Sequence, residues 1–141
     1  MRQLEMAHHF CHKHSQGLQC DTISNVVKGM LGIISIEAYI DKQKLAFFGS
    51  VFRTPPTDLV NRLITYRLFY YSMRITDKRF CFIPDIHRIM TKYNLLYYFD
   101  QAITTSTFPA KFQWKRVCSQ TIHRCEQEQC YIRMSLNTDF T

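Results

Sequence analysis

The sequence has few of the residues that turns in a β-protein require. Only four glycines and four prolines occur among its 141 residues. Tight hairpins depend on glycine for backbone conformations with positive φ, so this shortage disfavours an all-β architecture. The hydrophobic fraction of 46% and the charged fraction of 21% are those of a globular chain. A helical protein with short connections is therefore expected.

Signals for membranes, secretion and disulfides are also missing. No run of about 18 apolar residues is present, as a membrane-spanning helix would need. The first residues contain no apolar signal segment. The six cysteines include no CxxC pair, and their spacing matches no compact disulfide framework. We therefore expect reduced cysteines, no membrane contact and a location in the cytosol or the nucleus.

What the sequence does contain is apolar residues at helical spacing along most of its length. The central stretch, Ser35 to Phe52, begins with a residue suited to cap a helix, and the prolines at 55 and 56 stop it. Its expected buried face consists of Ile36, Ile40, Phe47, Phe48 and Val51, and its expected solvent face of Asp41, Lys42, Gln43 and Lys44.

Further helices are expected on both sides of this stretch, at about 3–16, 22–31, 57–73, 84–93, 94–103 and 109–133. The pattern thus predicts a single all-α domain of six to seven short helices around a central helix at about 35–52. This domain should cover residues 1–133, and residues 134–141 should form a frayed tail.

The string IxxxIDKxKLxFFGxxxR, which begins at Ile36, resembles the region downstream of the polymerase core in LINE-type (non-LTR) retrotransposon reverse transcriptases of invertebrates. The strings LExAHxFCxKxxQGL from Leu4, FIPDIxRIMxKYNLxYYxD from Phe82 and FPAKFQWKRVC from Phe108 resemble further segments of that region, in the same order. The resemblance implies a helical part that follows the fingers, palm and thumb and helps to hold template RNA or target DNA. It also places Met1 inside the family's first helix, which suggests a truncated copy.

The catalytic part of such an enzyme is not in this sequence. A polymerase needs clustered carboxylates to hold two Mg²⁺ ions, but the aromatic-x-Asp-Asp turn is absent and no two acidic residues are adjacent. We therefore expect a non-catalytic accessory fragment that uses no cofactor. The alternative is a decayed or domesticated transposon fragment that acts only as a protein-interaction or structural module.

The basic residues are the candidate nucleic-acid contacts. The formal charge is +7. Phosphates can be contacted by basic side chains alone, and aromatic faces can stack on unpaired bases. A solvated basic surface without a partner is the other interpretation. The candidates for RNA or DNA contact are Lys111, Lys115, Arg116, Arg124, Arg62 and Arg67, with Arg74, Lys78 and Arg79 near them in sequence.

Two groups of histidine and cysteine residues are the candidates for metal binding. His8 and His12 are four residues apart, so on a helix they could chelate one ion. His9 stands where an HExxH protease would have glutamate, so an exposed polar helix face is the preferred interpretation. The second group has a spacing that fits no zinc motif, and Cys118 and Cys125 are expected on the core-facing side of a helix, together with Trp114. This group consists of Cys118, His123, Cys125 and Cys130.

Overall fold

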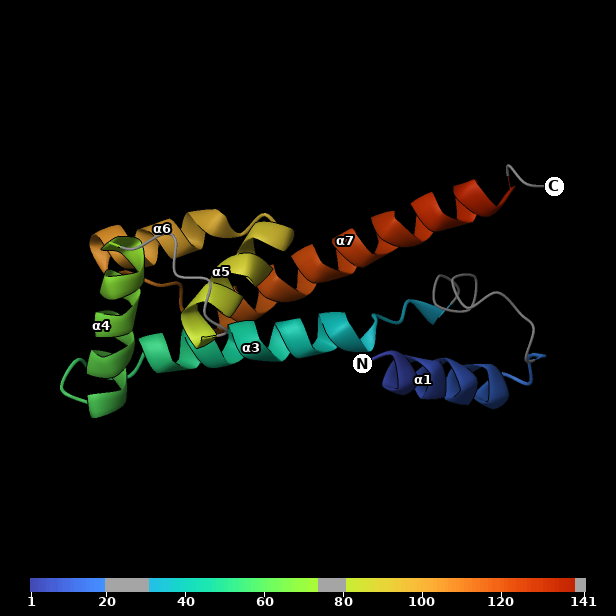
Figure 1. Ribbon diagram of the computed structural model, residues 1–141, viewed down its shortest axis with the longest axis horizontal. Helices are drawn as coiled ribbons and strands as arrows, with labels where there is room; N and C mark the ends of the chain where they lie inside the picture. Colours follow the sequence, from blue (N-terminus) through green and yellow to red (C-terminus); the bar gives the residue numbers. More distant parts are fainter. Residues whose placement is uncertain (20–30, 74–80, 139–141) are drawn as a thin grey trace. The chain divides into compact units, whose positions relative to one another are not determined.

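The computed structural model describes residues 1–19, 31–73 and 81–138, and every regular element within these ranges is a helix. The all-α prediction is therefore confirmed for the described part of the chain (Figure 1). The helices are α1 (Arg2–Ser15), α3 (Ile36–Phe52), α4 (Leu59–Met73), α5 (Phe82–Lys92), α6 (Leu96–Thr105) and α7 (Lys111–Thr138).

Local sequence signals account for most of the helix ends. The backbone N–H of Ala38 donates to Ser35 Oγ at 3.1 Å, which confirms Ser35 as the cap of α3. Gly17 and Gly32 have φ values of 65° and 61°, a region that glycine enters without steric cost. The N–H of Leu18, which follows Gly17, donates to the carbonyl of Lys13 in the last turn of α1 at 2.9 Å, as in a Schellman motif.

The chain forms two compact units. The terminal unit contains Met1–Ile40 and Gln120–Thr141, and the central unit contains Asp41–Ser119. α3 and α7 each contribute residues to both units, whereas α4, α5 and α6 belong to the central unit alone.

The core of the central unit forms where α3, α5, α6 and the start of α7 pack together. The indole of Trp114 is buried and its Nε1–H donates to the carbonyl of Leu45 at 2.8 Å, so the hydrogen-bonding group of this large side chain is satisfied. Its close approach to α3 is possible because Gly49 has no side chain. The other buried apolar residues include Phe48, Leu68, Ile83, Ile86, Ile89, Met90, Leu95 and Phe99.

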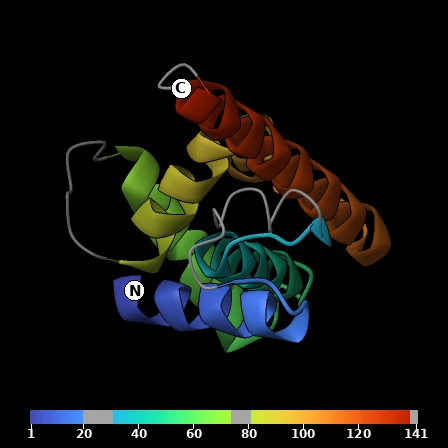
Figure 2. The ribbon, with the colours of Figure 1, turned by 90° about the vertical axis from the view of Figure 1, so that its right-hand side faces the viewer.

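The terminal unit depends more on polar contacts with the start of α3. The N–H of Ser35 donates to Glu126 Oε2 at 3.0 Å, and the N–H of Glu37 donates to Glu5 Oε1 at 3.3 Å. The first N–H groups of a helix have no acceptor within the helix, and its positive end favours carboxylates. Apolar burial is slight here, since α1 buries no residue. Figure 2 shows the successive turns of α1, in blue, next to the N-terminus of the chain.

The buried face of α3 differs from the predicted one. Phe47 was expected in the core but is 56% exposed, whereas Asp41 was expected in solvent and is only 2% exposed. The observed face consists of Ala38, Asp41, Leu45, Phe48 and Val51, whose spacing of three and four residues also fits a helix. α3 has apolar residues on several sides, so periodicity alone did not identify the packed one.

Other predictions need smaller corrections. The helix expected at 3–16 is present as α1, but its apolar residue Leu4 is 53% exposed. α5 begins two residues before Pro84, which is tolerated in the first turn because its missing N–H would have no partner there. α7 continues to Thr138, into the segment expected to be a tail. The helix expected at 22–31 lies almost entirely outside the described residues.

Candidate functional site

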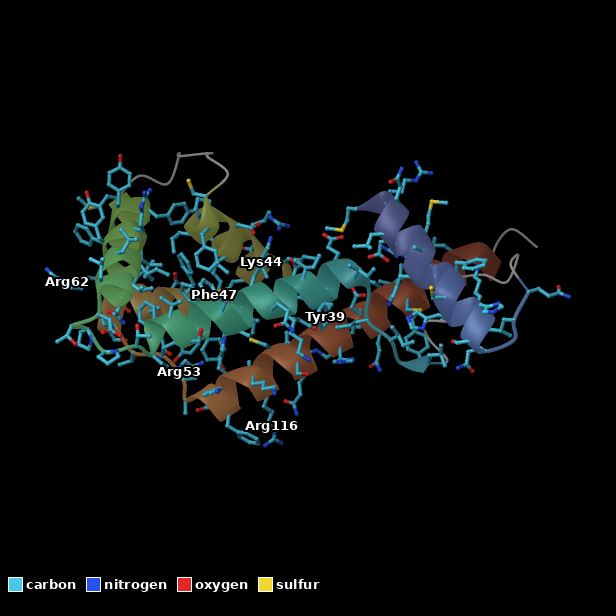
Figure 3. All side chains as sticks on the ribbon, turned by 90° about the horizontal axis from the view of Figure 1, so that it is seen from below. Tyr39, Lys44, Phe47, Arg53, Arg62 and Arg116 are labelled. Atoms are coloured by element: carbon cyan, nitrogen blue, oxygen red, sulfur yellow. The ribbon has the colours of Figure 1, made fainter. Side chains whose placement is uncertain are left out.

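Three of the predicted nucleic-acid contacts gather on the first turns of α7. Three cations are exposed there: Lys111, Lys115 and Arg116. Phe112 lies between the first two in the sequence and is 79% exposed. Figure 3 shows Arg116 projecting outward from α7. Arg124 is exposed farther along the same helix, in the part that belongs to the terminal unit. The start of α7 therefore presents three cations and one aromatic ring to solvent.

Two further candidates lie on α4. Arg62 and Arg67 are exposed, and Figure 3 shows Arg62 projecting away from the helix. They have exposed aromatic neighbours, since Tyr66 is 64% and Phe69 is 61% exposed. The remaining candidates of this group, residues 74, 78 and 79, lie outside the described part of the chain.

The acidic residues of the central unit leave these cations unpaired. Asp85 Oδ2 lies 2.6 Å from Lys44 Nζ, and its Oδ1 lies 2.8 Å from a terminal nitrogen of Arg88. Although its partial burial acts in the opposite direction, the hydrogen bonds and charges of these two cations lower the pKa of Asp85. No such ion pair joins an acidic residue to Arg62, Arg67, Lys111, Lys115 or Arg116 among the residues that the structure describes.

The charge balance of the central unit follows from its composition. Its described residues, 41–73 and 81–119, contain ten Lys or Arg and four Asp or Glu, which gives a net charge of +6. Two of the four acidic residues are used in ion pairs with lysine or arginine. The central unit therefore presents an uncompensated positive charge to solvent.

The buried carboxylate of Asp41 is a structural contact that sequence reasoning missed. Asp41 Oδ2 accepts hydrogen bonds from Lys92 Nζ at 3.1 Å and from the hydroxyl of Tyr93 at 3.0 Å. Burial, together with the charge of Asp41, raises the pKa of Tyr93. Burial alone would lower the pKa of Lys92, but its hydrogen bonds to Asp41 and Tyr93 raise it above the ordinary value. This cluster joins α3 to the end of α5 through hydrogen bonds to a carboxylate that is only 2% exposed.

The exposed side of α4 is the second feature that sequence reasoning missed. The helix is rich in apolar residues, but Leu68 is its one buried residue among those that the structure describes. Seven large apolar side chains on this helix are exposed instead: Leu59, Val60, Leu63, Tyr66, Phe69, Tyr70 and Met73. Periodicity identified the apolar residues of α4 but could not show that most of them are exposed among the described residues.

The structure brings the predicted histidine pair together and adds two residues to it. The Nε2 atoms of His8 and His12 are 2.8 Å apart. Glu5, His8 and His9 each place a ligand atom within 4.8 Å of the other two. His14 lies apart from this group, since its ring stacks on Phe10 with a centroid distance of 6.1 Å.

The cysteine group is not assembled into a comparable site. Within the described ranges, Glu5, His8 and His9 are the only three metal-capable side chains with ligand atoms this close. Cys118 is buried as expected, and burial raises the pKa of its thiol to about 12. Cys125 and Cys130 are partly exposed on the part of α7 that belongs to the terminal unit.

None of the described helices is long and apolar enough to cross a membrane.

Comparisons with known proteins identify no relative. No protein-family model, no curated protein and no solved structure matches this chain. The resemblance to LINE-type reverse transcriptases thus stays a prediction from the sequence.

Proposed function

We propose that this chain is a non-enzymatic helical module that binds RNA or single-stranded DNA, mainly through phosphates and with little sequence preference. The observation that carries the proposal is the set of exposed cations on the central unit that have no acidic partner among the described residues: Arg62, Arg67, Lys111, Lys115 and Arg116. The resemblance to the region after the polymerase core of a LINE-type reverse transcriptase supports the same function.

The side chains on these surfaces suit binding to single-stranded nucleic acid without recognition of particular bases. Lysine and arginine side chains neutralise phosphates whatever the sequence, and their binding releases counterions. Phe112 and Tyr66 are exposed beside the cations, and an aromatic face can stack on any unpaired base. Phosphate contacts position a protein on nucleic acid but do not specify a sequence.

A salt titration tests the proposal quantitatively. Fluorescence anisotropy would follow binding of the full chain to a labelled single-stranded oligonucleotide. Five phosphate contacts predict a slope of about −3.5 for log K against log salt, or about a hundredfold loss of affinity between about 50 and 200 mM. Two oligonucleotides of unrelated sequence should give affinities within about threefold of each other, because no base is read.

Removal of the α7 cations sharpens the test. The triple variant Lys111→Gln, Lys115→Gln, Arg116→Gln leaves two of the five contacts. It should reduce the slope to about −1.4 and weaken binding to both sequences equally. A matched control removes three cations from the terminal unit: Arg2→Gln, Lys13→Gln and Arg133→Gln. If both triple variants lower the slope by the same amount, the binding is a property of net charge and the proposed surface is wrong. Undetectable binding at about 50 mM salt would end the proposal.

A second candidate function, protein interaction, is favoured by the exposed face of α4. Leu59, Leu63, Tyr66, Tyr70 and Met73 follow one another at spacings of four, three, four and three residues, and all are at least 40% exposed. This is the repeat of residues that line the interface of a two-helix coiled coil. The occupant that we infer is a helix of a partner protein with the same apolar repeat.

The charges beside this repeat indicate what kind of helix fits. Arg62 and Arg67 occupy the two positions that flank the apolar repeat, and α4 contains no acidic residue. In a dimer of two α4 helices these arginines would face arginines, in parallel or antiparallel orientation. A partner with glutamate or aspartate at the flanking positions would instead form ion pairs, so the expected partner is an acidic amphipathic helix.

Peptide binding separates this partner from the alternatives. A synthetic amphipathic helix with leucine at the repeat and glutamate at the flanking positions should bind the chain, and a version with lysine at those positions should not. Leu63→Ser should abolish peptide binding but leave oligonucleotide binding unchanged. Equal binding of both peptides, or self-association of the chain that Leu63→Ser reverses, would contradict the acidic partner.

A further inference from the structure

The metal-capable side chains of α1 lie on a single side of that helix. Glu5, His8, His9 and His12 are spaced by three, one and three residues, which places all four within one helical face. Each is partly buried, although α1 as a whole buries no residue. Packing against an apolar core therefore does not account for the position of these imidazole and carboxylate groups.

The distances within this group are close to those of a metal centre. Glu5 Oε2 lies 3.6 Å from His9 Nε2, and Glu5, His8 and His9 have ligand atoms within 4.8 Å of one another. Ligands held at about 2.0–2.1 Å around a tetrahedral zinc ion are about 3.4 Å from one another. Small side-chain rotations would bring these three groups to that separation without a change in the helix.

We propose that Glu5, His8 and His9 bind a divalent transition metal ion of the zinc type. Two imidazoles and one carboxylate are a ligand set that zinc accepts, with solvent in the fourth position. His12 is a positioning residue, because its Nε2 lies 2.8 Å from Nε2 of His8 and so fixes the orientation of that ring. The site has no glutamate in the place of an HExxH general base, so metal binding and not hydrolysis is proposed.

The position of Glu5 gives the ion a structural consequence. Glu5 Oε1 accepts a hydrogen bond from the N–H of Glu37 at 3.3 Å, while its Oε2 faces His9. An ion bound to Glu5 would therefore connect α1 to the first turn of α3 within the terminal unit. Since α1 has no buried side chain to anchor it, this connection should be the main effect of the metal on stability.

The experiment titrates Zn²⁺ into the full chain against a chromophoric chelator. One zinc ion per chain is expected, and His8→Ala and His9→Ala should each weaken binding by at least about tenfold. His14→Ala is the matched control on the same helix and should bind as the wild type does. Zinc should also slow tryptic cleavage after Lys13 in the wild-type chain but not in His9→Ala.

The six cysteines are the competing ligands, so a second measurement identifies the donor atoms. With Co²⁺ as the probe, nitrogen and oxygen ligands give no thiolate-to-metal charge-transfer band. In NMR spectra of the imidazole groups, the signals of His8 and His9 should shift on addition of Zn²⁺, and those of His14 and His87 should not. A thiolate band, or equal zinc affinity in the wild type and His9→Ala, would overturn the proposed site.

Discussion

The contact between Gly49 and Trp114 gives the most decisive test of the central core. A Cβ added at Gly49 would lie 2.6 Å from Trp114 Cδ1 and 2.7 Å from its Nε1, closer than carbon atoms approach without displacement. The indole cannot yield easily, because Trp114 is 1% exposed and donates to the carbonyl of Leu45 at 2.8 Å. We therefore predict that Gly49→Ala destabilises the central unit.

The size of this loss in stability follows from one favourable and two unfavourable contributions. Alanine is favoured over glycine inside a helix by about 1 kcal/mol. Overpacking of a close-packed core costs about 1–3 kcal/mol. A displaced indole would lose its buried hydrogen bond, at a further cost of about 1–3 kcal/mol. The expected net loss for Gly49→Ala is therefore about 1–5 kcal/mol, although helix propensity by itself predicts a gain.

Urea unfolding followed by fluorescence provides the assay. Trp114 is the only tryptophan of the chain, so its emission reports on this core. Ser50→Ala is the matched control, since Ser50 is the exposed neighbour on the same helix and the change should alter stability by less than about 0.5 kcal/mol. If Gly49→Ala were as stable as the wild type or more stable, the packing of Trp114 on α3 would be wrong.

Three further predictions test the burial and the charges of the central unit. Phe48→Ala should cost about 3–5 kcal/mol because Phe48 is fully buried, whereas Phe47→Ala at a 56% exposed position should cost less than about 1 kcal/mol; equal losses in urea unfolding would contradict the observed face of α3. In alkylation followed by mass spectrometry, the exposed Cys11 and Cys81 should react before Cys118, which should react only on unfolding because it is buried and its thiol pKa is raised to about 12. The pKa of Asp85 is lowered in the folded state, so its contribution to stability is complete above the unfolded pKa of about 3.9 and is lost as the pH falls below that value. Asp85→Asn should therefore reduce the dependence of the melting temperature on acidic pH. An unchanged dependence would show that the ion pairs of Asp85 do not stabilise the fold.

The sequence by itself determined the secondary structure and many of its boundaries. Ser35 caps α3 through its own side chain, and Gly17 and Gly32 adopt positive φ, because these effects involve only neighbouring residues. The buried face of α5 was also predictable, since Ile86, Ile89 and their neighbours form the single apolar side of that short helix.

Tertiary structure alone decided which apolar sides are buried. α3 and α4 have apolar residues on more than one side, so periodicity allows several faces, and only the position of the neighbouring helices selects one. Asp41 can be buried because Lys92 and Tyr93, which follow it by 51 and 52 residues, donate hydrogen bonds to its carboxylate. No local sequence pattern reveals partners at such a separation. The exposed face of α4 has the same origin: the apolar repeat was visible in the sequence, but whether another part of the chain covers it depends on packing between distant segments.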